Sequence, residues 1–227
     1  MRSPRYAICY TPPPSSPLAC FGAGVLGYDC FERVSVPHLT PDRITPSLPA
    51  LATLDVRRYG FRAKLVEPFC LSDCCEDEIV ARLDSFSRAH APIPVGPLQV
   101  VAIGPVVALV PTQADPRLGA FASACLTAFD PYSVALASEA ERCTSGALAQ
   151  VGADLLDRDR PADLAYFRMT LTGPLAASEV ELFTRLLSRA FAPMASDRVE
   201  IDAVSLMRQD DLADSFFVLA RRRLTGR

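Results

Sequence analysis

In both halves of the chain, a stretch with apolar residues at helical spacing is followed by two strand-like apolar runs. In the first half, apolar residues recur at helical spacing over 76–88, after an acidic first turn that suits a helix dipole. Apolar runs at 98–103 and 106–110 then flank Gly104-Pro105, a pair typical of a turn between two strands. We expect a helix and two strands here, with Ser72-Asp73 as the helix N-cap.

The second half repeats this pattern. A second helical stripe follows Ser178, which we expect to cap it, and strands are expected at 199–207 and 216–220. Between the two halves, residues 115–129 have helical spacing, and a further helix is expected over 138–156.

A five-residue motif marks the start of each repeat. Phe61-Arg62-Ala63-Lys64-Leu65 recurs 106 residues later as Phe167-Arg168-Met169-Thr170-Leu171, each with an aromatic residue before it and a proline after it. The repeat units then cover about 57–111 and 164–221, with connecting helices at about 115–160. Two related units predict one bilobed domain over 1–227, with pseudo-two-fold lobes that share a groove.

The N-terminal quarter of the chain is rich in proline. Residues 6–10 are expected to form a strand, which the prolines at 12–14 end. Residues 36–54 contain four prolines and are expected to be either an ordered loop or a linker. Both alternatives stay open.

Composition narrows the class of protein. Half of the 227 residues are hydrophobic, which is enough for a core without stabilising disulfides or metal ions. The formal net charge is −3. This charge gives no support to a basic nucleic-acid surface or a polybasic membrane anchor, so long nucleic acids are not expected as partners. The apolar stretch 95–111 contains two Gly-Pro pairs, and no signal peptide is recognisable, so a cytoplasmic protein without a membrane span is expected.

The eight cysteines are expected to be reduced and mostly buried, as in cytosolic proteins. Cys70, Cys74 and Cys75 come close together, but two adjacent cysteines are poorly spaced for one tetrahedral zinc site, and no histidine pair follows. Neither a metal nor a cofactor is therefore predicted. The two histidines, His38 and His90, are expected to be exposed or to cap a helix.

Three short segments resemble one known superfamily. Arg5-Tyr6-Ala7-Ile8, Arg58-Tyr59-Gly60-Phe61 and Met169-Thr170-Leu171-Thr172-Gly173 are similar to segments of the two-histidine phosphoesterases, and in particular to a bacterial branch named for phosphonate metabolism. The superfamily includes RNA 2',3'-cyclic phosphodiesterases and 2'-5' RNA ligases. The resemblance runs almost end to end. It implies a bilobed, pseudo-two-fold α+β fold in which two antiparallel sheets line a central groove, with helices outside.

The resemblance also implies a His-x-Thr or His-x-Ser motif on each lobe, in which one histidine is the general base and the other the general acid on a phosphodiester. Arg62 and Arg168 hold the two histidine positions of this chain. Lys64 holds the first hydroxyl position, and Thr170 alone keeps the family residue. Arginine keeps its proton above about pH 12, so no catalytic residue is assigned.

The replaced motifs still suit an anion. On a strand, Arg62 and Lys64 point to one face, because side chains alternate. Arg168 and Thr170 do the same on the other lobe. Opposed lobes would bring three cations and one hydroxyl together, which is a cradle for phosphate, sulfate or carboxylate.

Aromatic residues flank both motifs. Tyr59 and Tyr166 are candidates for stacking on a nucleotide base. Period-two alternation puts Phe61 and Phe167 on the face opposite the cations, so these two are expected in the core. As an alternative that stays open, the cations are solvated and paired with acids of neighbouring elements.

Three functional hypotheses follow. The leading one is a protein that lacks both catalytic histidines and binds a phosphoryl-bearing small molecule or nucleotide through the polar residues of the two motifs. The second keeps it an enzyme, a phosphoesterase or cyclic phosphodiesterase that uses Lys64 or a substrate group for proton transfer. In the third hypothesis, the protein has only a structural or protein-binding role and binds no small ligand.

Overall fold

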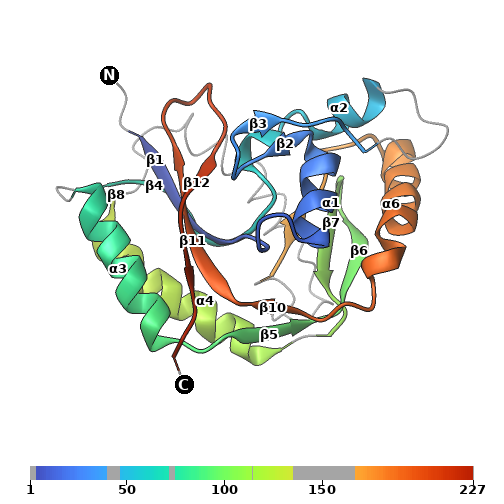
Figure 1. Cartoon of the computed structure of the whole chain (residues 1–227). Coiled ribbons are helices and arrows are strands. Elements are labelled where there is room, and N and C mark those ends of the chain that lie inside the picture. The colour runs from blue at the N-terminus through green and yellow to red at the C-terminus, as the bar shows by residue number, and fades with distance from the viewer. Residues whose placement is uncertain (1–3, 40–46, 72–74, 114, 135–166, 227) are drawn as a thin grey trace.

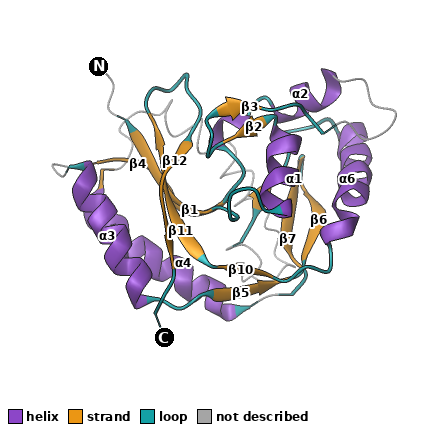
Figure 2. Ribbon diagram, viewed as in Figure 1, coloured by secondary structure: helices purple, strands orange, loops and turns teal. Residues whose placement is uncertain are grey.

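The computed structural model describes residues 4–39, 47–71, 75–113, 115–134 and 167–226. Figures 1 and 2 show an α+β fold, in which strands from both ends of the chain form a curved sheet with helices around it. Every strand pair within these ranges is antiparallel. The expected fold class, α+β with antiparallel pairing, is confirmed.

One sheet joins the two halves of the chain. Its strands lie in the order β12 (Phe217–Arg223), β11 (Ala203–Gln209), β1 (Arg5–Tyr10), β4 (Ala63–Leu71), β9 (Met169–Thr170), β7 (Val106–Pro111) and β6 (Leu98–Ile103), and β8 (Ser133–Val134) pairs with β4. The family resemblance led us to expect two antiparallel sheets that line a groove. Instead β9 pairs with both β4 and β7, and this joins them into one.

The two repeat units exchange their hairpins. β4 of the first unit lies in the same half of the sheet as β1 and the β11–β12 hairpin of the second unit. β9 of the second unit lies beside the β6–β7 hairpin of the first. The other described strands form two small two-stranded sheets. In one, β5 (Ile93–Gly96) pairs with β10 (Val199–Ile201), and in the other, β2 (Tyr28–Asp29) pairs with β3 (Val34–Ser35). Each half of the sheet is therefore built from both units.

Helices α3 (Glu76–Ala89), α4 (Pro116–Phe129) and α6 (Ala177–Phe191) cover one face of the sheet. They contact β11–β12, β4 and β6–β7 respectively (Figure 1). Their apolar stripes share one core with Phe61 and Phe167, which are 4% and 0% exposed. The expected core position of both phenylalanines is confirmed.

The remaining helices are short. They are α1 (Pro17–Leu26), α2 (Ser47–Thr53) and the 3-10 turns η1 (Arg57–Tyr59), η2 (Asp130–Tyr132) and η4 (Ala192–Met194). Neither α1 nor α2 was predicted. The Pro-rich segment 36–54 thus contains a helix, which favours the ordered alternative for its C-terminal part. The helix expected at 138–156 lies outside the described residues.

The acidic first turn expected for α3 is confirmed, but the capping residue of both helices differs from the prediction. α3 begins after Cys75, and α6 begins after Ala176, so that Ser178 lies inside its helix. In each case the third helical residue provides the cap, because the carboxylates of Glu78 and Glu179 accept hydrogen bonds from the N–H groups of the residues that precede the helices. A carboxylate at this position replaces the hydroxyl that we expected.

The histidines act as local caps. His90 ends α3, and its Nδ1 lies 2.8 Å from the carbonyl oxygen of Phe86. Nδ1 of His38 lies 3.1 Å from the carbonyl oxygen of Val25, near the end of α1. The cap-like interpretation is confirmed for His90, and His38 is half-buried in a similar role.

Among the described cysteines, the thiols of Cys9, Cys30 and Cys125 are buried, and burial raises the pKa of Cys30 to about 12. Cys20 and Cys75 are exposed. Within the described ranges, no cluster of three or more His, Cys, Asp or Glu side chains could hold a metal ion. In that same part of the chain, no helix has the length and apolar character needed to cross a membrane.

Candidate functional site

The predicted site residues lie on the sheet face opposite the main helix-covered core. On this face Cys9 and Ala108 are fully buried in two smaller apolar clusters. We call it the inner face and define it by Cys9, Lys64, Thr170 and Ala108. Cys9 pairs with Lys64 across β1 and β4, and Thr170 pairs with Ala108 across β9 and β7. The alternate residues of these strands belong to the core with the helices, so the inner-face side chains point to the opposite side.

The junction of β4 and β9 brings the two motifs together. Ala63 and Met169 are direct partners in an antiparallel pair. The residues on either side of such a pair also face one another, which places Lys64 opposite Arg168 and Arg62 opposite Thr170. The four polar residues that the sequence singled out therefore meet on the inner face.

Arg62 is the most enclosed of the four, with 9% of its surface exposed. Its Nη1 donates a hydrogen bond of 2.7 Å to the carbonyl oxygen of Tyr59. Its guanidinium carbon lies 5.1 Å from the ring centre of Tyr59 and 5.0 Å from that of Phe216, within the range of cation–π attraction. Tyr59 and Phe216 stack on each other, with ring centres 5.9 Å apart. Tyr59, a predicted base-stacking residue, thus packs against Arg62. The other predicted stacking residue, Tyr166, lies outside the described residues.

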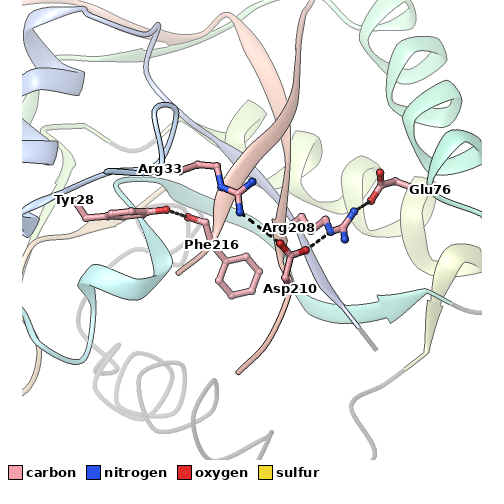
Figure 3. Close-up of polar contacts among 6 residues, drawn as sticks. All are labelled: Tyr28, Arg33, Glu76, Arg208, Asp210 and Phe216. Atoms are coloured by element: carbon pink, nitrogen blue, oxygen red, sulfur yellow. Dashed lines mark hydrogen bonds and ion pairs between the residues drawn. The ribbon is translucent and has the colours of Figure 1, made fainter. Parts of the chain in front are cut away.

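Two separate sets of polar contacts lie near β11 (Figure 3). The hydroxyl of Tyr28 donates to the carbonyl oxygen of Phe216 at 3.1 Å. Arg208 contacts Glu76 at 2.7 Å and Asp210 at 2.6 Å, and Arg33 reaches Asp210 at 3.5 Å. These two arginines are therefore neutralised by carboxylates.

Lys64 forms an ion pair with Glu67, a residue that sequence reasoning missed. Regular alternation would put residues 64 and 67 on opposite faces of β4. However, Cys9 pairs with Lys64 while Ile8 pairs with Val66, so β4 carries one extra residue at this point. Such a β-bulge shifts the alternation by one, and it returns Glu67 to the inner face.

The cations of the site affect one another. Burial lowers the pKa of Lys64, the carboxylate of Glu67 opposes this, and the charges of Arg62 and Arg168 lower it further. Burial also lowers the pKa of Arg168, again opposed by Glu67. Among the described residues, no carboxylate forms an ion pair with Arg168, and no side-chain hydrogen bond involves the Thr170 hydroxyl. Lys64, Arg168 and Thr170 thus offer positive charge and a hydroxyl that an anion can use.

Gly60 allows the chain to present Arg62. Its φ of 69° and ψ of 169° lie in a region that is essentially restricted to glycine. A Cβ here would lie 2.8 Å from the Cβ of Cys30, which sits in the same cluster as Phe216.

Gly60→Ala is therefore expected to lower the free energy of unfolding by about 1–3 kcal/mol. Chemical denaturation in urea measures this. Gly24→Ala is the matched control, because Gly24 lies inside α1, where a Cβ would make only an ordinary contact of 3.6 Å with Leu39. The control is expected to gain about 0.5–1 kcal/mol. Equal effects of the two changes would argue against a special conformation at Gly60.

Comparison with known proteins gives one curated relative. The ribose 1,5-bisphosphate phosphokinase PhnN of Janthinobacterium sp. (strain Marseille) is 28% identical over 215 residues, which are 91% of this chain and 48% of that protein. The chain thus spans about half the length of the curated relative that it matches.

Two solved structures align over nearly the whole chain, but with low similarity. TT0787 of Thermus thermophilus has 14% identity and a TM-score of 0.44, with 98% of both chains covered. E. coli LigT, complexed with 3'-AMP, has 11% identity and a TM-score of 0.37, with 99% of this chain and 100% of that chain covered. Similarity at this level does not identify a fold.

A family model provides the firmest assignment. It matches residues 64–217, which include Lys64, the whole second motif and most of the sheet. Its description is "Protein of unknown function (DUF1045)". This chain therefore belongs to the DUF1045 family.

Proposed function

We propose that the chain binds a phosphoryl-bearing small molecule or nucleotide at the β4–β9 junction, on a two-histidine phosphoesterase-like frame that has lost its catalytic pair. The observation that carries this proposal is the meeting of Lys64, Arg168 and Thr170 on one face, across the Ala63–Met169 pair. Arginine offers a planar fork of donors and lysine a compact charge, and both suit phosphoryl oxygens. A bound phosphoryl group would provide a counter-charge for Arg168, which has no carboxylate ion pair among the described residues.

Family-type catalysis fits this site poorly. The mechanism that the resemblance implies needs one group that takes a proton and one that gives a proton near neutral pH. The arginines at the two histidine positions stay protonated and can do neither. Both histidines of the chain instead contact backbone carbonyl groups elsewhere, at Val25 and Phe86. Each missing acid or base removes roughly 10²–10⁴ of rate.

The name of the curated relative supports a phosphorylated ligand. That protein is named for a kinase reaction on a ribose bisphosphate, and this chain matches about half of it. A P-loop kinase needs lysine after glycine, followed by serine or threonine. The 227 residues contain one lysine, Lys64, which follows Ala63. We therefore propose a phosphorylated sugar or nucleotide as the class of ligand, without P-loop kinase chemistry in this chain.

One observation favours a second candidate, a phosphoesterase that uses Lys64. Burial and the flanking arginines lower the pKa of Lys64, and a lysine with a lowered pKa can act as a base. Its ion pair with Glu67 works against this, because the carboxylate favours the protonated ammonium.

Two assays separate the candidates. Hydrolysis of 2',3'-cyclic nucleotides tests turnover, and titration calorimetry with ribose 5-phosphate, AMP and inorganic phosphate tests binding. Binding without hydrolysis, lost in Arg168→Ala, is the result that we expect. Hydrolysis that disappears in Lys64→Ala would support the enzyme instead. No signal in either assay would support a structural or protein-binding relic and would overturn the proposal.

A further inference from the structure

One carboxylate stands among the cations of the site. Arg62 directly precedes β4, and along the strand the inner face then presents Lys64 and Glu67, whose ammonium and carboxylate form an ion pair. The charge of Glu67 also reaches Arg168, whose pKa it raises against the effect of burial. Glu67 therefore marks one end of the site, three residues along the strand from Lys64.

A ligand can open the Lys64–Glu67 ion pair, but the Glu67 carboxylate then still lies close to Lys64. The side chain of Glu67 is 55% exposed and that of Lys64 is 32% exposed. Ion pairs at such exposure are weak, so a phosphoryl group can take the place of the carboxylate on Lys64. The β-bulge between Lys64 and Val66 places the Glu67 side chain on the same face as Lys64, where the two form their ion pair. A displaced carboxylate therefore remains next to any bound anion.

The balance of formal charge at the site is small. Lys64 and Arg168 carry two positive charges, and Glu67 balances one of them. Arg62 adds a third positive charge, but this charge lies behind Tyr59 and Phe216. A single phosphoryl group carries a charge of up to about −2, which such a site can balance. Each further phosphoryl group adds negative charge that the site does not match, and along β4 it would approach Glu67.

We propose that Glu67 makes the anion site selective for ligands with a single phosphoryl group, which are phosphate monoesters and diesters, over pyrophosphates and polyphosphates. The inference rests on the proposed function, and it narrows the class of ligand. A carboxylate at this place repels a second phosphoryl group, whereas it can accept a hydrogen bond from a hydroxyl on the alcohol part of an ester.

Titration calorimetry with two probes, ribose 5-phosphate and tripolyphosphate, tests this selectivity. The buffer has fixed ionic strength and contains no divalent cations, which would neutralise the polyphosphate. We compare the unchanged protein with Glu67→Gln, which keeps the shape of the side chain and removes its charge. Glu181→Gln is the matched control, since Glu181 lies on α6 with its side chain 79% exposed.

The unchanged protein is expected to bind tripolyphosphate no more tightly than ribose 5-phosphate. Glu67→Gln is expected to tighten tripolyphosphate binding about tenfold and ribose 5-phosphate binding at most about threefold, because the lost repulsion acts mainly on the extra phosphoryl groups. Glu181→Gln leaves both affinities unchanged. An equal gain for the two probes, or a preference of the unchanged protein for tripolyphosphate, overturns the selectivity and leaves the proposed function standing. Absence of binding in every protein overturns both.

Discussion

Replacing Lys64 and Arg168 together by alanine is expected to weaken the binding of ribose 5-phosphate by roughly 100-fold or more. Each hydrogen bond to a charged group contributes about 1.5–3 kcal/mol, or roughly tenfold to 100-fold in affinity. Both side chains lie on the inner face at the β4–β9 junction, so one phosphoryl group can contact both. Titration calorimetry measures the change.

The same variant separates binding from folding. Arg168 has no carboxylate ion pair within the described residues, and Lys64 has only its exposed pair with Glu67. The double variant is therefore expected to keep the free energy of unfolding within about 1 kcal/mol, or to raise it. A matched double variant, Arg117→Ala with Arg185→Ala, removes the same charge from exposed helix positions and is expected to bind normally. An equal loss of affinity in the two double variants would mean that binding depends on the net charge of the protein and not on this site.

Phe167→Ala is expected to lower the free energy of unfolding by about 3–5 kcal/mol. Phe167 directly precedes Arg168, but its ring is fully buried and lies 5.5 Å from the ring of Tyr10 on the opposite side of the sheet from the cations. The loss comes from the transfer of a large apolar side chain and from the cavity that remains. Urea denaturation followed by circular dichroism measures it.

Leu126→Ala serves as the comparison for this change. Leu126 lies on α4 with half of its surface exposed, so its loss is expected to cost at most about 0.5 kcal/mol. If Phe167→Ala instead kept its stability and lost ligand binding, the ring would belong to the site, and the assigned faces of β9 would be wrong.

Alternation along the two repeated motifs predicted more of the site than any other feature of the sequence. It placed Phe61 and Phe167 in the core and grouped Lys64 with Arg62 on the other face, and the structure agrees. Such a prediction works because side-chain direction in a strand depends only on local backbone geometry. The β4–β9 junction is known only from the structure, because no local sequence pattern determines that Ala63 pairs with Met169.

Other features depend on contacts that no local pattern encodes. Glu67 reaches the site because a bulge interrupts the alternation, and the bulge is visible only in the pairing of β4 with β1. The enclosure of Arg62 needs Phe216, which arrives from the far end of the chain. The exchange of hairpins between the two repeat units is likewise set by packing across the whole sheet, because both arrangements use the same elements.

A crystal structure with a bound phosphate ester tests the central claim most directly. The account predicts phosphoryl oxygens within about 3.2 Å of Lys64 Nζ and of the Arg168 guanidinium, with the Thr170 hydroxyl beside them and the Lys64–Glu67 pair opened. A structure in which Lys64 and Arg168 point into separate regions of solvent, with the ester bound elsewhere, would contradict it.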